Sequence, residues 1–191
     1  MTHKGLPVHL FERYPHWLEW LEENHAQNDS IWLQFAKKAS QKVSLSYEEA
    51  REGALRYGWI DGLKNRLDDD YHLIKFSPRR PRSRWSQINR QICEQLLAEG
   101  KVMPSGLAQI EAAKADGRWQ AAYPSQGQIE VPDDLQALLA ANPRALETFS
   151  GLTSSQRYAI LYRLHDAKRP ETRQRRLAQF MALLLEGRGP R

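Results

Sequence analysis

The chain contains a single cysteine, Cys93, and therefore cannot form an internal disulfide. It also lacks any run of about 18 apolar residues, which argues against a transmembrane helix. The first residues, MTHKGLPVHLFERYPHW, contain no apolar stretch of about 7–15 residues and no small-residue cleavage site of a secretory signal. Because disulfide-free chains are typical of reducing compartments, these absences predict a cytoplasmic protein.

Signatures of known catalytic machinery are missing as well. There is no glycine-rich phosphate loop, GxSxG, HExxH or paired CxxC motif, and the six histidines are scattered along the chain. Asp68, Asp69, Asp70 and His72 have the donor types of a metal site, but adjacent acids in a turn are usually solvated. We therefore expect no metal, no cofactor and no catalytic residue, and we favour a non-enzymatic protein.

The residues that are present suit a compact, basic protein. Of the 191 residues, 41% are apolar and six are tryptophans, which is enough for a bulky core in a main domain with a small second one. The formal net charge is +5 and the pI is about 9.4. This charge favours anionic partners, although it is modest for a dedicated nucleic-acid-binding arm.

The first half of the chain has the pattern of an α+β domain. Pro15 suits the first turn of a helix over 15–25, and Ser46 with Glu49 has the spacing of a capping box that opens a second helix, which Gly58 ends. The predicted strands are residues 31–37, 59–66 and 71–77. We expect them to form a small, mostly antiparallel sheet of about three strands, with helices packed against it.

In the second half of the chain the apolar residues follow a helical pattern, and proline and glycine mark the ends of the predicted helices. Helices are expected over 84–98, 104–116, 132–141 and 143–150, after Thr153, and from Pro170 onwards. The predicted inward-facing stripes of the first two helices are Trp85, Ile88, Ile92 and Leu96, and Leu107, Ile110 and Ala113. The predicted divisions are an α+β domain at 1–122, a linker at 123–131 and a helical module at 132–191. Because the apolar stripes of this module are small, we expect it to pack onto the first domain.

The stretch 58–89 mixes aromatic, acidic and basic groups more than a core requires. Its basic cluster contains no Asp or Glu and consists of Lys75, Arg79, Arg80, Arg82, Arg84 and Arg90. Guanidinium groups suit a carboxylate or phosphate, and the cluster lies at a predicted helix entry, which attracts anions. The alternative is a solvated loop whose arginines pair with acids elsewhere in the chain.

Asp61 lies on the strand face that alternation assigns to Trp59 and Leu63. A carboxylate between large apolar groups needs a partner or a pocket edge, and Arg79 or Arg80 are candidate partners. In one interpretation this pair is an internal salt bridge that fixes the hairpin. In the other, Asp61 orients a ligand-binding arginine or has a shifted pKa.

A second basic cluster occupies 163–176, with six Lys or Arg against two acids. Arg173 falls in the first turn of the last helix, where the helix dipole disfavours positive charge. We expect either an acidic surface of the first domain or a bound anion to compensate. The alternative is an ordinary exposed helix face on which Glu171 and Arg175 form an i,i+4 pair.

Six segments together carry a family resemblance. They are WLEWLEENH (17–25), IWLQFAKK (31–38), GWIDG (58–62), FSPRRPRSRWSQIN (76–89), DGRWQAAY (116–123) and AKRPETRQRRL (167–177). With these segments the chain resembles the YdeI/OmpD-associated family over nearly its whole length, and residues 132–191 resemble that family's helical module. The resemblance implies a bacterial protein linked to resistance against bacteriocins or cationic antimicrobial peptides, and it implies no known reaction.

Three functional hypotheses follow from these observations. The favoured one is a non-enzymatic protein for stress or bacteriocin protection that binds a small anionic ligand or an acidic protein segment. The second is a nucleic-acid-binding protein that uses the clusters 75–90 and 163–176, and the third is an enzyme with Asp61 as general base. The candidate ligand-binding residues are Trp59, Asp61, Lys64, Arg79, Arg80, Trp85, Asn89, Lys168, Thr172 and Arg173.

Overall fold

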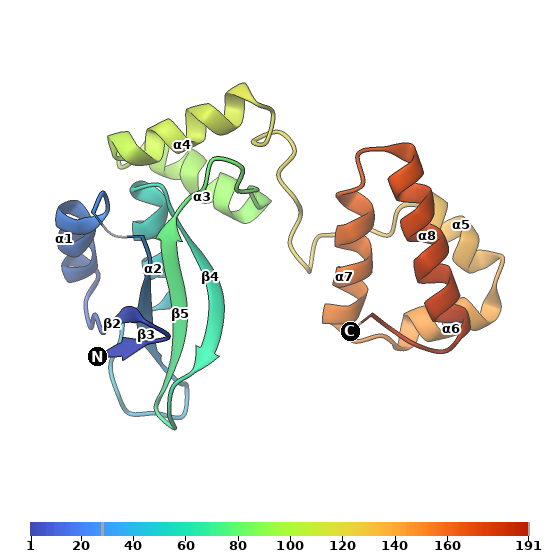
Figure 1. Cartoon of the computed structure of the whole chain (residues 1–191), viewed down its shortest axis with the longest axis horizontal. Coiled ribbons are helices and arrows are strands. Elements are labelled where there is room, and N and C mark those ends of the chain that lie inside the picture. The colour runs from blue at the N-terminus through green and yellow to red at the C-terminus, as the bar shows by residue number, and fades with distance from the viewer. Residues whose placement is uncertain (28, 191) are drawn as a thin grey trace. The chain divides into compact units, whose positions relative to one another are not determined.

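The structure of the protein is a computed structural model that describes residues 1–27 and 29–190. Within these residues the chain is an α+β protein with one five-stranded sheet and eight helices (Figure 1). It divides into two compact units. The N-terminal unit comprises 1–85 and 89–121, and the C-terminal unit comprises 86–88 and 122–191.

Three strands lie where the sequence predicts them. They are β3 (Ile31–Ala36), β4 (Trp59–Arg66) and β5 (Tyr71–Pro78), and β5 pairs antiparallel with both of the others. The strand order of the complete sheet is β1-β2-β3-β5-β4. The hairpin of β4 and β5 therefore forms one edge of the sheet and carries several of the predicted site residues.

The expectation of about three strands is wrong, because two short strands precede them. β1 (Thr2–His3) and β2 (Leu6–His9) form a hairpin through Lys4 and Gly5, which both have positive φ. β2 then pairs parallel with β3, with Val8 opposite Trp32. Both strands are short and β2 contains a proline, so the sequence shows no run of alternating residues that would reveal them.

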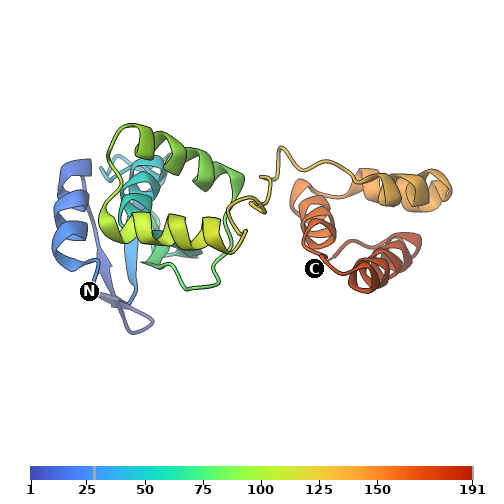
Figure 2. The same ribbon diagram turned by 90° about the horizontal axis from the view of Figure 1, so that it is seen from above.

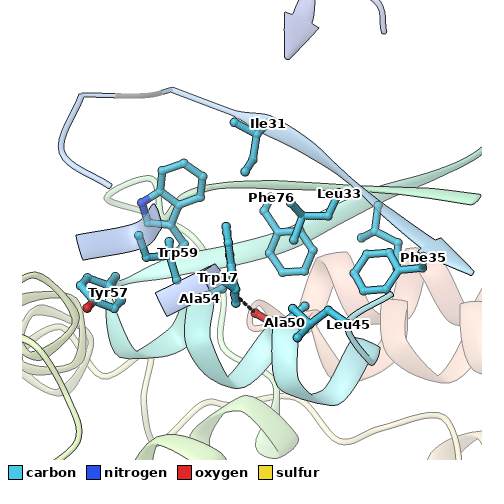
Figure 3. Packing of buried hydrophobic residues seen from close by; sticks show 12 residues of the cluster. Trp17, Ile31, Leu33, Phe35, Leu45, Ala50, Ala54, Tyr57, Trp59 and Phe76 are labelled. Carbon is cyan, nitrogen blue, oxygen red and sulfur yellow. Dashed lines mark hydrogen bonds between the residues drawn. The ribbon is translucent and has the colours of Figure 1, made fainter. Parts of the chain in front are cut away.

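Helices α1 (Tyr14–Asn24) and α2 (Tyr47–Arg56) pack with the sheet around the main core of the N-terminal unit (Figure 3). The predicted capping box is confirmed: Ser46 Oγ accepts a hydrogen bond from the Glu49 backbone N–H, and the Glu49 side chain accepts one from the Ser46 N–H. Trp17 is fully buried and its Nε1 donates to the Ala50 carbonyl oxygen at 3.0 Å. This bond fixes α1 on α2 above the sheet.

Two more helices, α3 (Gln87–Ala98) and α4 (Pro104–Ala115), follow the hairpin (Figure 2). Their inward faces agree in part with the predicted ones: Leu96, Ile110 and Ala113 are buried as predicted, whereas Ile88 and Ile92 are half-buried. The buried residues are Asn89, Cys93 and Leu96 on α3, and Gly106, Ile110 and Ala113 on α4. A Cβ added to Gly106 would lie 2.2 Å from the carbonyl oxygen of Arg56, so α4 approaches α2 through its glycine. This close approach selects the buried face of α4 and leaves Leu107 exposed.

The C-terminal unit is entirely helical, as the sequence predicts. Its helices are α5 (Asp133–Ala140), α6 (Pro143–Gly151), α7 (Ser154–His165) and α8 (Pro170–Leu185). Their apolar faces enclose a core of their own that includes Leu135, Phe149, Leu161, Leu177, Phe180 and Leu184. The capping box of Thr153 and Gln156 is also confirmed at the start of α7.

Candidate functional site

Arg79 and Trp85, two of the predicted site residues, stack on each other in the loop after β5. The guanidinium carbon of Arg79 lies 3.5 Å from the centroid of the Trp85 ring, and Arg79 Nη1 donates to the Arg84 carbonyl oxygen at 3.1 Å. Arg79 is only 5% exposed and Trp85 is buried too. A buried guanidinium over an indole face is a stabilising cation–π arrangement. Arg79 therefore contributes to holding this loop closed.

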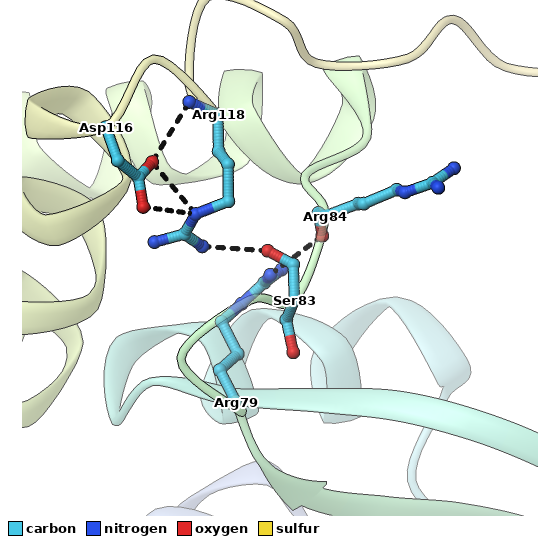
Figure 4. A network of polar contacts seen from close by, with 5 residues as sticks. All are labelled: Arg79, Ser83, Arg84, Asp116 and Arg118. Atoms are coloured by element: carbon cyan, nitrogen blue, oxygen red, sulfur yellow. Dashed lines mark hydrogen bonds and ion pairs between the residues drawn. The ribbon is translucent and has the colours of Figure 1, made fainter. Parts of the chain in front are cut away.

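A second arginine, Arg118, which is not among the candidate residues predicted from the sequence, holds the same loop in place (Figure 4). Its Nη1 donates to the Ser83 carbonyl oxygen at 2.8 Å, and its Nε lies 2.7 Å from a carboxylate oxygen of Asp116. The backbone N–H of Arg80 donates to Ser83 Oγ at 3.0 Å, while the Arg80 side chain is exposed. These hydrogen bonds form a polar network that holds the loop between β5 and α3 in one conformation.

Trp59 and Asn89 belong to the packed interior. Trp59 is buried, its Nε1 donates to the His25 carbonyl oxygen at 3.1 Å, and its ring contacts Trp20 edge-to-face. Asn89 lies in the first turn of α3 and is buried as well. Both side chains are therefore part of the packed interior and not of an open surface.

Asp61 has a different partner from the predicted arginines. Its carboxylate accepts a hydrogen bond of 2.9 Å from the hydroxyl of Tyr47, the first residue of α2. Burial, and next the negative charge of Asp61, raise the pKa of Tyr47 to about 12, so the phenol keeps its proton. The guanidinium of Arg51 lies over the same ring, 5.1 Å from its centroid. The Asp61–Tyr47 bond thus links β4 to the start of α2.

A β-bulge between Asp61 and Lys64 changes which side chains share a face of β4. Before the bulge Asp61 pairs with Phe76, and after it Lys64 pairs with Ile74. The extra residue therefore places Lys64 on the same face as Asp61, where strict alternation would have placed Leu63. The predicted position of Leu63 beside Asp61 is wrong, and Leu63 is 66% exposed.

Beyond the bulge lies an open pocket, which we call the basic pocket. Its volume is about 460 Å³, and its lining is Lys37, Lys64, Asn65, Arg66 and His72. Arg66 lies opposite His72 in the β4–β5 ladder, and Lys37 directly follows β3. Three permanent cations, one after β3 and two on β4, thus line one depression whose lining contains no carboxylate.

The charges of the basic pocket are only partly balanced. Lys37 Nζ donates to the carbonyl oxygen of Asp68 at 2.5 Å, and Arg66 pairs with Asp69 at 2.6 Å in a largely solvent-exposed contact. Lys64 is exposed and has no ion pair with any residue in the described ranges. Burial, and then the positive charges of Lys64 and Lys37, lower the pKa of His72. The pocket therefore combines excess positive charge with an imidazole whose protonation is disfavoured until a negative charge is bound nearby.

The three candidate residues of the C-terminal unit lie around the start of α8. Lys168 is exposed and Thr172 is half-buried. Arg173 donates two hydrogen bonds to Asp134, at 2.6 and 2.7 Å, and a third to the Leu164 carbonyl oxygen at 2.8 Å. The compensation expected for its charge therefore comes from an acid within the same unit, and Arg173 ties α8 to α5 and α7.

Other residues of the 163–176 cluster are also engaged within the C-terminal unit. Arg176 lies 3.6 Å from Asp166 and donates to the Arg163 carbonyl oxygen. In the part of the chain that the structure covers, no group of three or more His, Cys, Asp or Glu side chains is arranged to hold a metal ion. None of its helices has the length and apolar character needed to cross a bilayer.

Comparisons with known proteins divide the chain in a similar way. Residues 9–109 match the family described as "Domain of unknown function (DUF8412)", and residues 128–187 match the family described as "Bacteriocin-protection, YdeI or OmpD-Associated". No curated protein and no solved structure matches the chain. The resemblance found in the sequence is thus supported by a partial match in the C-terminal unit. The chain belongs to the DUF8412 family, and its C-terminal unit carries the YdeI/OmpD-associated match.

Proposed function

We propose that this chain is a non-enzymatic binding protein whose N-terminal unit holds a small, multiply charged anion in the basic pocket. The observation that carries the proposal is the lining of that pocket, which brings Lys37, Lys64 and Arg66 together without a carboxylate. A phosphoryl, sulfate or carboxylate ligand accepts hydrogen bonds from ammonium and guanidinium groups. The imidazole of His72 supplies a further polar group at the same place.

The pocket is also accessible to a ligand at low energetic cost. The Arg66–Asp69 pair is largely exposed, and such pairs contribute only about 0–1 kcal/mol, so an incoming anion can compete with Asp69. Lys64 needs no rearrangement, because it has no competing ion pair among residues 1–27 and 29–190. Lys64 is therefore the residue on which we expect binding to depend most.

We infer further that this binding serves protection under stress. The family matched by residues 128–187 is described by bacteriocin protection, and we extend that description to a protective role exerted through binding of an anion or an acidic protein segment. The nucleic-acid hypothesis has less support, because Arg79, Arg173 and Arg176 make contacts within the chain. The enzyme hypothesis has less support too, because Asp61 is engaged by Tyr47.

The test is a titration of the whole chain with sulfate, phosphate, pyrophosphate and citrate, followed by calorimetry and by the melting temperature. A bound anion at about 100 times its Kd stabilises the folded state by about 2.7 kcal/mol, which corresponds to a rise of several degrees. Lys64→Glu should abolish this rise. Arg82→Glu, at an exposed position in the loop after β5, makes the same change in net charge and should retain it. Equal responses of the two variants would refute the pocket as the site.

A further inference from the structure

The C-terminal unit contains a groove of about 680 Å³ between α5 and α6. Its apolar lining is Val131, Leu139, Ala140, Leu146 and Phe149. Pockets of a few hundred Å³ with mostly apolar walls and a few polar groups are the usual form of a binding site. The groove lies within the region matched by the YdeI/OmpD-associated family and contains none of the candidate residues predicted from the sequence.

The two helices shape the groove as a trough. Leu139 on α5 and Phe149 on α6 are buried in the core of the unit and form the floor. Leu146 is one helical turn before Phe149, so it lies on the same side of α6, yet it is 44% exposed. A large apolar side chain left half open beside a trough between two helices suits the apolar face of a third helix.

The rim of the groove is acidic. Glu130 and Asp133 are exposed, and neither has an ion pair within the described part of the chain. Their neighbour Asp134, in contrast, is bound by Arg173. The one cation in the lining, Arg157, is engaged in the wall: its Nη2 donates to the Ser150 carbonyl oxygen at 3.1 Å and its guanidinium lies over the Phe149 ring. The charge available to an occupant is therefore negative.

We propose that this groove docks an amphipathic helix of a partner protein, with its leucine-like face in the trough and its lysines or arginines beside Glu130 and Asp133. Apolar anchors at helical spacing would contact Leu146, Leu139 and Val131. Basic residues next to these anchors would pair with the two acids on the rim and select against acidic helices. This inference is independent of the basic pocket, which lies in the other unit.

Two synthetic amphipathic helices test the proposal: one of leucine and lysine, and one of leucine and glutamate with the same apolar spacing. Each is titrated into the full-length chain and followed by fluorescence anisotropy of a label on the peptide. The leucine–lysine helix should bind, and the leucine–glutamate helix should bind at least about tenfold more weakly. Equal or tighter binding of the acidic helix would overturn the proposal.

Matched variants then locate the binding. Leu146→Asp should abolish it, whereas Leu138→Asp, on α5 outside the lining and 38% exposed, should leave it unchanged. Glu130→Lys should weaken it by about tenfold, and Glu147→Lys, an exposed position outside the lining, should have little effect. Circular dichroism and the melting temperature confirm that each variant is folded. Binding that survives Leu146→Asp, or a self-association of the chain that Leu146→Asp abolishes, would refute a partner helix as the occupant.

Discussion

The two units of this chain use their charged residues in opposite ways. In the C-terminal unit the segment 163–176 is basic, but Arg173 is bound by Asp134 and the nearby Arg176 by Asp166. In the N-terminal unit Lys37 follows β3 while Lys64 and Arg66 lie on β4, and all three line one pocket without a carboxylate in its lining. A run of positive charge in the sequence therefore marks a stabilising network in one unit, and dispersed cations form the open site in the other.

The difference arises from how each unit brings distant residues together. A helical bundle places an arginine next to acids on neighbouring helices, so a dense basic run finds partners within the unit. A sheet aligns residues from different strands at fixed spacing, so Lys64 and Arg66 on β4 share a face with His72 on β5. Positive charge can then accumulate at the end of the sheet beyond the residues that α1 and α2 cover.

The largest expected effect concerns two helical glycines, one in each unit: Gly106 is in close contact with another helix, and Gly151 is not. Gly106→Ala should destabilise the N-terminal unit by about 1–3 kcal/mol or more, because the new Cβ would meet the Arg56 carbonyl oxygen at 2.2 Å and the backbone has to move. Gly151→Ala, at the end of α6, meets nothing within 4 Å and should be neutral or slightly stabilising. Denaturant unfolding of both variants measures the difference.

Equal stabilities of the Gly106 and Gly151 variants would show that α2 and α4 do not rely on a glycine contact. The inward face assigned to α4 would then be in doubt, and with it the reason why Leu107 is exposed. Gly106→Ser serves as a second probe, since it adds the same Cβ with a polar atom. It should be at least as destabilising as alanine.

The next effect compares the stability contributed by Arg173, which is paired within the chain, with that contributed by Lys64, the proposed ligand-binding residue. Arg173→Met should lower the free energy of unfolding by about 1 kcal/mol, because it removes two charge-assisted bonds to Asp134 from a partly exposed pair. Lys64→Met should not lower it, since Lys64 has no ion pair in the described ranges. A double-mutant cycle of Arg173→Met with Asp134→Asn, followed by urea unfolding, measures the coupling.

The Arg173–Asp134 pair also makes the free energy of unfolding depend on pH in the acid range. Hydrogen bonds from Arg173 lower the pKa of Asp134 below its ordinary 3.8. The stabilisation is therefore fully present above pH 3.8 and is lost as the pH falls through the lowered value. In Arg173→Met this part of the acid dependence should disappear. If the free energy of unfolding of Arg173→Met depends on pH in the same way as that of the unmodified chain, the Arg173–Asp134 pair contributes no net stability in solution.

Much of the fold follows from local signals in the sequence, and the site does not. The capping boxes at Ser46 and Thr153 and the three main strands are visible because each depends on residues a few positions apart. The strands β1 and β2 are too short to show a period. On α4 the helical pattern correctly predicts that Ile110 and Ala113 face inward, but the burial of Gly106 in place of Leu107 depends on a contact with Arg56, which is distant in sequence.

Among the predicted site residues, Lys64 lies in the basic pocket and Asp61 lies on the other side of the β4 bulge. Lys37, Arg66 and His72 join Lys64 only through the pairing of β3, β4 and β5, and a one-residue bulge is not readable from alternation. Arg79 was singled out for its charge, yet its stack on Trp85 makes it part of the loop. A basic run can thus be recognised in a sequence, but whether its charges are already paired depends on the tertiary structure.

The smallest effect concerns the coupling of anion binding to protonation of His72. The groups that face this imidazole are Lys64 and Arg66 on β4, Lys37 after β3, and the ring of Phe35, on which it stacks. Burial, followed by the charges of Lys64 and Lys37, lowers its pKa below 6.5, so the unfolded chain binds the proton more readily. Stability should therefore fall slightly as the pH drops below 6.5.

A bound anion reverses this balance, because its negative charge favours the imidazolium form. Sulfate does not titrate near neutral pH, so its affinity should rise about three- to tenfold between about pH 7.5 and pH 5.5, with proton uptake on binding. His72→Gln should bind sulfate with an affinity that no longer depends on pH, whereas Lys64→Glu should lose binding at both values. Calorimetry in two buffers of different ionisation enthalpy measures the uptake. If His72→Gln keeps the pH dependence, the proton is taken up elsewhere and the imidazole is only a wall of the pocket.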